Sequence, residues 1–403
     1  MMLVRRLLLY FKRTSFARYC SIIYSNLCGL IAVFFYLFRI FPIDSSKIVV
    51  MNNRGNGYYD HPKYICEELL SRNQNVRIVW IINPSIVNKA DFPDTIKLVR
   101  FNSLRSIYEL STAKVWIDTT RKGLFTRKRK EQYYIQTWHG FGPKKMSVNP
   151  SKIGQSTVNG LNREAKFMDL VLSNNSYLSY MYRTDFQFVC DILECGFPRN
   201  DIFFKESTKV DVASIKERLS IDSEKKIVMY APTYRIGKTA LSIEQFEIDY
   251  NELFSSLKER FGGDWVFLIR LHPFLRGLNK FKTQDDYIDV STYLDMQELL
   301  YISDVLITDY SSAMFDFALT NRPCLLYTPD LDDYSKNGFC IQPDELPFPL
   351  ATTEAELHAQ ILAFDDEKYQ TNLVASLNKY GFVEKGTASK DVADIILQKI
   401  HTS

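Results

Sequence analysis

Six short runs in the first half of the chain are apolar at almost every position instead of alternating apolar and polar. They occupy residues 47–52, 76–83, 96–101, 114–118, 133–137 and 169–174. Such a pattern is typical of a strand covered on both faces, as in a parallel sheet. The intervening stretches 61–72 and 103–113 carry apolar residues at helical spacing. This alternation predicts right-handed βαβ units and a doubly wound sheet.

The same pattern restarts after CGFPRNDIFF, residues 195–204. Apolar runs at 225–233, 265–273, 303–312 and 323–330 each lead into a polar loop, and helical spacing recurs between them. We therefore expect an α/β protein with two Rossmann-like domains, 47–205 and 206–403, and a C-terminal helix that packs back on the first. Ligands of such sheets bind beyond the carboxyl ends of the strands, so the cleft between the domains is the expected site.

The first 46 residues form a separate basic and apolar segment. Arg5, Arg6, Lys12, Arg13 and Arg18 precede the first acidic residue, and residues 21–41 are nearly long enough to span a bilayer. We favour helices lying in an anionic membrane surface, with the basic residues on the cytoplasmic side. A single transmembrane span, a signal peptide and a buried core helix are the alternatives.

A second basic block, residues 121–130, has six cations in ten residues. It is either a solvated loop or a contact with anionic lipid or an anionic polymer. The net charge of +3 and the lack of nucleic-acid-binding motifs argue against nucleic acid as a partner. The seven cysteines form no CxxC pair, which indicates a reducing compartment. No metal-binding motif occurs, so we expect neither a metal nor a cofactor.

The segment QTWHGFGPKKMS, residues 136–147, follows an apolar run and combines three kinds of chemistry. His139 titrates near neutrality and suits a general base, although a structural histidine at a strand end is the alternative. Gly140 and Gly142 allow the backbone to approach a ligand closely. Lys144 is placed to face a phosphate.

Four further segments place polar residues where strands end or helices begin. Arg270 and His272 are two apart on one strand tip, where both can face the cleft and the arginine suits phosphate. Thr353 has a glutamate three residues on, so helix capping is the default reading and an anion contact the alternative. The other candidate contacts are Thr233, Arg235, Asp309, Ser311, Ser312 and Thr352.

In order, the segments YYIQTWHGFGPKKMS, CGFPRND, VMYAPTYR, LIRLHP, ISDVLITDYSSAMFDFALTNRPCLLYTPDLDDY and PDELPFPLATTEAEL resemble the CDP-glycerol:polyol glycerophosphotransferase family of teichoic acid and phosphopolyol capsule biosynthesis. The resemblance implies a GT-B-like fold, monotopic association with the cytoplasmic face of the cell membrane, and no metal in the chemistry. The family usually reads His-Gly-Thr-Pro where this chain reads His-Gly-Phe-Gly-Pro, so the threonine hydroxyl is missing here.

The resemblance assigns the family's essential histidines to His139 and His272. It places contacts to the substrate diphosphate and nucleotide on Gly140, Phe141, Gly142, Arg199, Thr233, Tyr234, Arg270, Leu271, Thr352 and Thr353. It implies a CDP-glycerol or CDP-ribitol donor and an acceptor that is a lipid-linked saccharide or a polyol-phosphate chain.

The resulting hypothesis is attack of an acceptor hydroxyl on the β-phosphate of a CDP-polyol, with His139 as base and release of CMP. Glycerol is favoured over ribitol as the polyol. A glycosyltransferase or epimerase that uses a nucleotide sugar is one alternative, although the expected strand ends carry His, Arg, Ser and Thr instead of carboxylates around a sugar. A membrane-bound assembly module without activity is the other.

Overall fold

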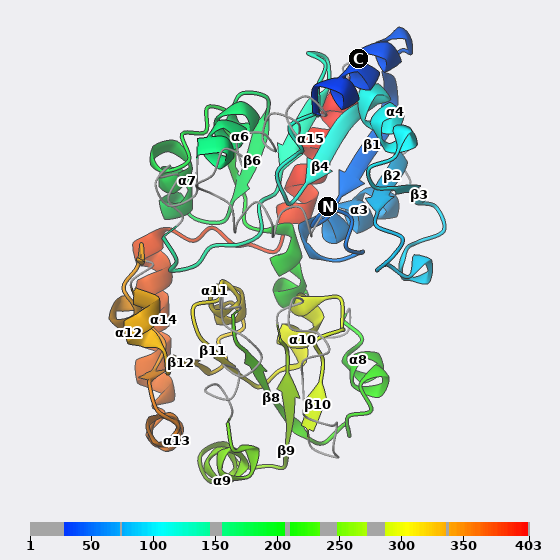
Figure 1. Ribbon diagram of the computed structural model, residues 1–403. Helices are drawn as coiled ribbons and strands as arrows, with labels where there is room; N and C mark the ends of the chain where they lie inside the picture. Colours follow the sequence, from blue (N-terminus) through cyan, green and yellow to red (C-terminus); the bar gives the residue numbers. More distant parts are fainter. Residues whose placement is uncertain are drawn as a thin grey trace, which may run out of the picture.

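The protein contains two parallel β-sheets, which lie one above the other in Figure 1. The computed structural model describes residues 28–72, 75–145, 155–205, 210–233, 248–271, 287–335 and 338–401. The strand orders are β3-β2-β1-β4-β5-β6-β7 in the first sheet and β10-β9-β8-β11-β12-β13 in the second. Helices flank both sheets, so the predicted α/β class with two doubly wound sheets is confirmed.

All six strands predicted for the first half are present, and a seventh joins them at the edge. The strands are β1 (Asp44–Met51), β2 (Arg77–Ile82), β3 (Lys97–Arg100), β4 (Ala113–Asp118), β5 (Tyr133–Gln136), β6 (Leu170–Ser173) and β7 (Asp191–Glu194). The helices here are α3 (Asp60–Ser71), α4 (Leu104–Thr112), α6 (Gln155–Ala165) and α7 (Ser176–Thr184), followed by the 3₁₀ helix η3 (Pro198–Phe204). None of the residues of β7 is buried, so it has no apolar run that the sequence analysis could detect.

The second sheet contains the four strands predicted for it and two short strands at its edges. Its strands are β8 (Lys226–Ala231), β9 (Trp265–Ile269), β10 (Tyr287–Asp289), β11 (Val305–Thr308), β12 (Cys324–Tyr327) and β13 (Leu350–Ala351). Its helices are α8 (Val212–Arg218), α9 (Tyr250–Phe261), α10 (Met296–Ile302), α11 (Ala313–Ala318), α12 (Leu331–Ser335) and α13 (Glu354–Leu362).

After α14 (Asp366–Tyr380) the chain returns to the first sheet as α15 (Ala388–His401). Val392 and Ile396 of α15 share one buried cluster with Ile65 and Leu69 of α3. The last strand of the first sheet ends at Glu194 and the first strand of the second begins at Lys226. The domain boundary predicted at residue 205 falls in this interval and stays a prediction.

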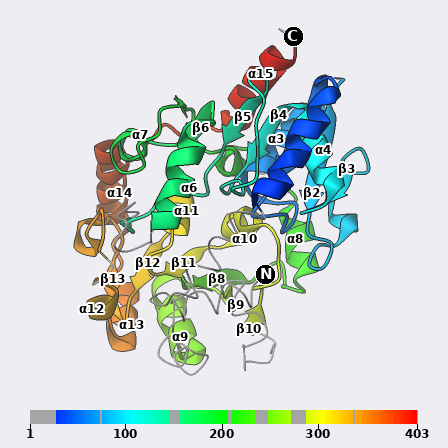
Figure 2. The same ribbon diagram turned by 45° about the horizontal axis from the view of Figure 1, so that its top comes forward.

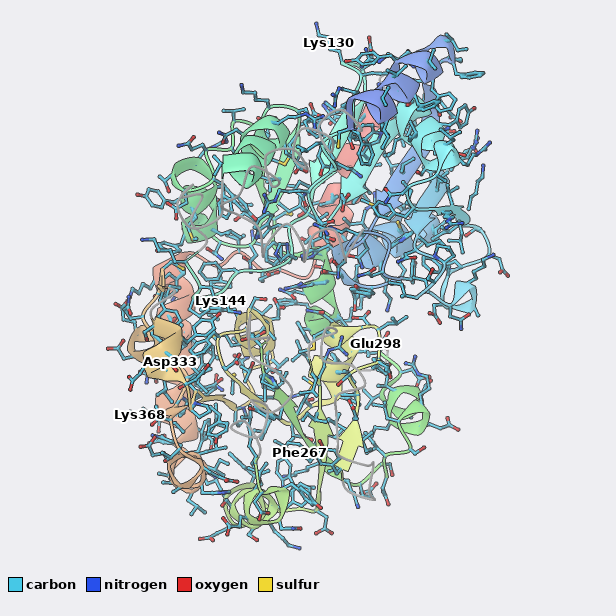
Figure 3. All side chains as sticks on the ribbon, in the orientation of Figure 1. Lys130, Lys144, Phe267, Glu298, Asp333 and Lys368 are labelled. Atoms are coloured by element: carbon cyan, nitrogen blue, oxygen red, sulfur yellow. The ribbon has the colours of Figure 1, made fainter. Side chains whose placement is uncertain are left out.

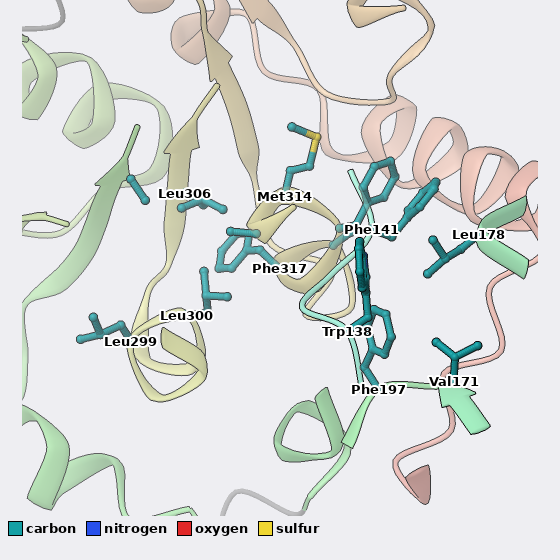
Figure 4. Packing of buried hydrophobic residues seen from close by; sticks show 14 of the residues in the cluster. Trp138, Phe141, Val171, Leu178, Phe197, Leu299, Leu300, Leu306, Met314 and Phe317 are labelled. Carbon is teal, nitrogen blue, oxygen red and sulfur yellow. The ribbon is translucent and has the colours of Figure 1, made fainter. Parts of the chain in front are cut away.

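A single apolar cluster joins the two sheets and fixes the loop after β5. Phe141, in this loop, is buried with its ring centroid 5.0 Å from that of Phe315 in α11. Figure 4 shows Trp138 and Phe141 beside Met314 and Phe317 of the same helix. Close packing of this kind restricts movement of the loop, so the loop keeps a fixed position relative to the second sheet.

Residues 28–37 form a helix that covers the first sheet with one face only. Phe35 on that face is fully buried, with its ring centroid 6.4 Å from that of Phe125. The opposite face carries the exposed side chains Leu30, Val33, Leu37 and, in the following 3₁₀ turn, Ile40. Figure 2 shows this helix in dark blue beside α4. None of the helices in the described part of the chain is long and apolar enough to cross a membrane, and residues 1–27 lie outside that part.

Candidate active site

His139 lies just beyond β5, at the carboxyl edge of the first sheet. Its side chain is exposed, and its Nδ1 lies 3.3 Å from the carbonyl oxygen of Thr119, which follows β4. A carbonyl oxygen only accepts hydrogen bonds, so Nδ1 carries the proton and the lone pair of Nε2 stays available. The ring therefore has the tautomer that a general base needs.

Trp138, the residue before His139, turns the chain so that His139 takes this position. Trp138 has a φ of 59°, which is unfavourable for any residue with a side chain. Such a conformation costs about 1–2 kcal/mol. The indole offsets this cost by edge-to-face packing on Phe186 and Tyr182, and it also packs against the imidazole of His139 with ring centroids 4.5 Å apart.

The surroundings of His139 keep it neutral near pH 7. Although the ring reaches solvent, the surrounding protein partly dehydrates it, and this desolvation lowers the pKa of His139. Asp60 and the Thr119 carbonyl oppose this, while the charges of Arg199 and Arg121 lower the pKa further. A neutral imidazole can accept a proton from an attacking hydroxyl.

Gly140 brings the loop against the second sheet. Its φ is 126°, and a Cβ at this position would lie 2.6 Å from Oγ of Ser312 and 2.8 Å from Nη2 of Arg199. Gly142 also faces Ser312, since a Cβ there would lie 3.3 Å from its Cα. The structure thus brings together five predicted site residues: His139, Gly140, Gly142, Arg199 and Ser312.

Arg199, in η3, ties this loop to both sheets. Its Nη1 donates to the carbonyl oxygen of His139 at 3.3 Å and to Oδ1 of Asp60 at 3.1 Å. Its Nη2 donates to Oδ2 of Asp316 in α11 at 2.7 Å. The guanidinium is buried and its charge is already compensated by two carboxylates. These contacts hold the loop after β5 in place.

A buried polar network extends from Asp316. Its carboxylate also accepts hydrogen bonds from Asn200 at 3.1 Å and Gln297 at 3.2 Å. Asn200 donates in turn to Glu384 at 2.8 Å, and burial raises the pKa of Glu384 to about 7. Burial also raises the pKa of Asp316, although the charge of Arg199 opposes the rise. Each of these groups has a partner, as buried polar groups require.

The sequence analysis missed two members of this network at the start of α3. His61, which no sequence motif singled out, is fully buried beside the site, and its Nδ1 accepts from the backbone N–H of Arg199 at 3.5 Å. Burial lowers the pKa of His61 to about 3, so the ring is neutral. Asp60 has a φ of 63°, and strained backbone of this kind often occurs at functional sites. That strain has no sequence signal, because Asp60 is the first residue of an otherwise ordinary helix.

In the second sheet, Asp309 holds the ends of two neighbouring strands together. It follows β11, and its carboxylate accepts from the backbone N–H and the hydroxyl of Thr233, which lies beyond β8, at 2.9 and 3.1 Å. It also accepts from the backbone N–H of Tyr310 at 2.5 Å. Asp309 is buried, so its observed role is to shape the DYSS segment that contains Ser311 and Ser312.

Arg270 and Leu271 follow the adjacent strand β9. Nη1 of Arg270 donates to the carbonyl oxygens of Tyr293 at 2.7 Å and Val290 at 3.4 Å. Leu271 is buried, and its backbone N–H donates to Oγ of Ser291 at 2.8 Å. Both residues therefore organise the loop after β10, and a phosphate contact of Arg270 stays a prediction.

Three other predicted contacts interact with protein groups. Lys144, labelled in Figure 3, pairs with Phe339 in an isolated bridge and lies over the ring of Tyr334, 5.7 Å from its centroid. Thr353 caps α13 in a capping box with Glu356, which confirms the capping prediction. Thr352 donates to the same carboxylate through its hydroxyl at 2.8 Å.

Phe141 has its side chain in the core, so a substrate contact there would involve its backbone. His272, Tyr234 and Arg235 lie outside the described residues. Among the residues that the structure describes, no group of three or more His, Cys, Asp or Glu side chains is arranged to hold a metal ion.

The basic block 121–130 is only partly solvated. Lys122 is buried and its Nζ lies 2.8 Å from Oδ2 of Asp118, while Lys128 pairs with Asp169. The solvated-loop alternative therefore holds for only part of the block, because these cations compensate buried or half-buried carboxylates. Arg121 is exposed and makes no hydrogen bond or salt bridge with any described residue.

Residues 33–398 match the family model described as CDP-Glycerol:Poly(glycerophosphate) glycerophosphotransferase. The chain belongs to this family. It is 30% identical to a teichoic acid poly(glycerol phosphate) polymerase of Bacillus spizizenii over 93% of this chain and 97% of the relative. It is also 30% identical to a teichoic acid glycerol-phosphate transferase of Staphylococcus aureus over 85% of this chain and 91% of the relative.

The fold of this glycerophosphotransferase family member matches solved structures of the wall teichoic acid polymerase TagF. One TagF variant superposes with a TM-score of 0.81 at 30% identity and covers 97% of this chain and 99% of the TagF chain. Another TagF variant was soaked with CDPG and superposes with a TM-score of 0.79 at 28% identity, covering 96% and 98% of the two chains. The GT-B-like arrangement predicted from the sequence is confirmed by this match.

Proposed function

We propose that this enzyme transfers glycerol phosphate from CDP-glycerol to a hydroxyl of a lipid-linked saccharide or a polyol-phosphate chain and releases CMP. The observation that carries the proposal is the position of His139 in a member of this family: it lies beyond β5 with its Nδ1 3.3 Å from the carbonyl oxygen of Thr119, which leaves Nε2 available as a base. The names of the two relatives described above favour glycerol over ribitol. A poly(ribitol-phosphate) polymerase of Bacillus spizizenii is also 30% identical, over 90% of this chain and 58% of the relative, so CDP-ribitol is the alternative donor.

In this proposal, the acceptor oxygen attacks the β-phosphorus of the CDP-polyol and its proton passes to Nε2 of His139. The bond from the β-phosphorus to the bridging oxygen breaks, and CMP leaves with the bonding electrons. The polyol phosphate is then linked to the acceptor as a phosphodiester. Positioning and electrostatic stabilisation supply most of the rate enhancement in such transfers.

The donor is proposed to lie at the carboxyl edge of the second sheet, in a cleft that faces His139. Thr233, Arg270 and the DYSS segment follow three adjacent strands there, β8, β9 and β11. The approach of Gly140 to Ser312 supports the proposal, because it brings the base close to this edge. His272, Tyr234, Arg235, Thr352 and Thr353 complete the proposed donor site, with Lys144 near the phosphates. The reaction is proposed to need no cofactor.

We also propose that the protein binds peripherally to an anionic membrane at its cytoplasmic face. The helix at 28–37 exposes apolar side chains on the side that does not contact the first sheet. Cations lie next to it, since Arg39 donates to the carbonyl oxygen of Lys128 at 3.3 Å and Arg129 to that of Phe41 at 2.8 Å. Apolar side chains bordered by cations are typical of interfacial membrane-binding surfaces.

Release of CMP by the purified full-length protein tests the proposed reaction. The protein and a synthetic lipid-linked acceptor are incubated in three separate reactions, each with one donor: CDP-glycerol, CDP-ribitol or a UDP-sugar. We expect acceptor-dependent CMP release with CDP-glycerol at a higher kcat/KM than with CDP-ribitol, and no UDP release. A preference for CDP-ribitol would reassign the donor, and UDP release without CMP release would overturn the proposal.

A further inference from the structure

Thr119, which orients the imidazole of His139, also holds the loop after β1. Its buried hydroxyl accepts a hydrogen bond from the backbone N–H of Asn53 at 2.9 Å and donates to Oδ1 of Asn52 at 3.0 Å. Its carbonyl oxygen lies 3.3 Å from Nδ1 of His139. The segments after β1, β4 and β5 therefore meet at this one residue, at the carboxyl edge of the first sheet and next to the proposed base.

Backbone strain is concentrated at the same place. Among the described residues, eight other than glycine have a positive φ, and half of them lie in the segments that follow β1 and β5. These four are Asn53, Arg54, Asp60 and Trp138, with φ values of 39°, 60°, 63° and 59°. Strain of this kind persists only where the surrounding structure enforces it, and it is frequent at ligand-binding sites.

The loop after β1 holds Arg54 in a fixed position. The backbone N–H of Gly55 donates to the carbonyl oxygen of Asn52 at 2.7 Å, and the carbonyl oxygen of Gly55 accepts from the N–H of Asn83 at 2.8 Å. Gly55 has a φ of 87°, and a Cβ at this position would lie 2.7 Å from the same nitrogen of Asn83. This close approach ties the loop to the end of β2, while the side chain of Arg54 stays exposed.

Arg121 is held in a similar way after β4. The backbone N–H of Thr120 donates to Oδ1 of Asp118 at 2.9 Å, and that of Lys122 donates to Oε1 of Glu164 at 3.0 Å. Both carboxylates are buried, so the two neighbours of Arg121 are anchored in the first domain. The side chain of Arg121 itself is exposed.

The guanidinium groups of Arg54 and Arg121 lie near each other without an anionic partner. Desolvation lowers the pKa of Arg121, the charge of Glu164 opposes this, and the charge of Arg54 lowers the pKa further. Burial raises the pKa of Glu164 to about 7, so its charge compensates Arg121 only in part near neutral pH. Within the part of the chain that the structure describes, neither arginine forms a hydrogen bond or a salt bridge through its side chain. Arg199 and Arg270, in contrast, are held by protein acceptors.

Two neighbouring arginines on a fixed surface are suited to a phosphate group, which accepts bidentate hydrogen bonds from a guanidinium. The topology indicates which substrate supplies it. Both arginines follow strands of the first sheet, whereas the donor is proposed to lie at the edge of the second. The other proposed substrate, a polyol-phosphate chain, carries a phosphodiester beside each polyol unit.

We propose that Arg54 and Arg121 form a subsite for the phosphodiester that precedes the reacting hydroxyl of the acceptor chain. The inference rests on the proposed function for the identity of the acceptor. A phosphodiester held there keeps the terminal polyol unit beside His139, whose Nε2 takes the proton. It follows that the enzyme favours acceptors that already carry a polyol phosphate over a lipid-linked saccharide without one.

Calorimetric binding of tri(glycerol phosphate) to the full-length protein tests the subsite separately from catalysis. CMP is present throughout, so that the donor site is occupied. We expect the wild type to bind the oligomer, and Arg54→Met and Arg121→Met each to lose about tenfold or more in affinity, because each removes a charge-assisted contact. Arg54→Lys should lose less, since it keeps the charge without the bidentate geometry.

Arg100→Met is the matched control. Arg100 is also an exposed arginine at the carboxyl end of a strand in the first sheet, but its strand, β3, is separated from β1 by β2. The affinity of this variant should equal that of the wild type. The melting temperature of each variant shows that it is folded, which is expected because all three side chains are exposed.

The steady-state counterpart compares two lipid-linked acceptors, with and without glycerol-phosphate units, at about pH 8. Both contain the same lipid and its linkage to the saccharide, so only a contact with the chain phosphodiesters changes the ratio of their kcat/KM values. Arg54→Met and Arg121→Met should each lower this ratio about tenfold or more in comparison with the wild type. Their KM for CDP-glycerol should stay within about twofold, since the donor is proposed to lie at the second sheet.

Four results would overturn the subsite. They are no oligomer binding by a wild type that turns over CDP-glycerol, equal weakening in Arg100→Met, folded Arg54→Met and Arg121→Met variants with wild-type affinity, and a rise in the KM for CDP-glycerol alone, which would place the arginines at the donor. Oligomer binding that depends on both arginines in a protein inactive with every CDP-polyol would instead support the subsite and refute the proposed function.

Discussion

The hydrogen bond between His139 and Thr119 fixes which imidazole nitrogen can act as a base. Replacing the side chain of His139 should therefore change the reaction rate but not the stability of the protein. His139→Ala should lower kcat/KM by about 10²–10⁴-fold, the usual contribution of general acid–base catalysis. The side chain is exposed and contributes little to the core, so the melting temperature should stay within a few degrees. A variant that folds and retains more than a tenth of the activity would remove His139 from the role of base.

The pH dependence of the reaction follows from the direction of the shift at His139. A base is lost when it is protonated, and the pKa of His139 lies below the ordinary value of about 6.5. The acid limb of the kcat/KM profile should therefore lie below pH 6.5. Arg121→Met removes a nearby positive charge that disfavours protonation, so it should move the acid limb to higher pH. An acid limb above pH 7 in the wild type would contradict the assignment.

At the scale of elements, η3 and α11 are joined by the buried pair of Arg199 and Asp316. Asp316→Asn should destabilise the protein by roughly 3 kcal/mol, because it leaves a buried guanidinium with less compensation. The double variant Arg199→Met with Asp316→Leu should recover part of that loss, since it removes both charges. Urea unfolding measures both effects. Equal stability of Asp316→Asn and the wild type would show that the pair contributes nothing to the junction.

The positions of the central strands were predictable, because burial on both faces leaves continuous apolar runs, as in RIVWII of β2 and WVFLI of β9. The strands β7, β10 and β13 were not predicted, because no residue of β7 is buried and because β10 and β13 are only three and two residues long. Of the site, sequence patterns predicted His139 and its glycines. The network of Asp60, His61 and Asp316 was not predictable, because its members are far apart in sequence and each occurs in an ordinary helical context.

At the scale of the whole molecule, the N-terminal helix presents its exposed apolar face away from the first sheet. Replacing Leu30, Val33, Leu37 and Ile40 with serine should reduce binding to anionic liposomes by about tenfold or more, since these exposed side chains would enter the lipid. High salt should weaken the remaining binding, which depends on charge. Unchanged liposome binding by this variant would move the membrane contact to residues 1–27 or elsewhere.

That substitution is a sharper test than deleting the whole segment before β1. Phe35 is fully buried against the first sheet, so a deletion through residue 43 would also uncover apolar surface at Phe125. A matched control is Leu362→Ser, which removes an exposed apolar side chain from α13, beside the second sheet. This control should bind liposomes like the wild type.

The mass spectrum of the acceptor after incubation with the purified full-length protein and CDP-glycerol tests the central claim most directly. A transferase with His139 as its base should extend a synthetic lipid-linked acceptor by whole glycerol-phosphate units, with one CMP formed for each, and His139→Ala should leave the acceptor at its starting mass. An acceptor extended by a sugar, or glycerol-phosphate addition that is as fast in His139→Ala as in the wild type, would contradict the account.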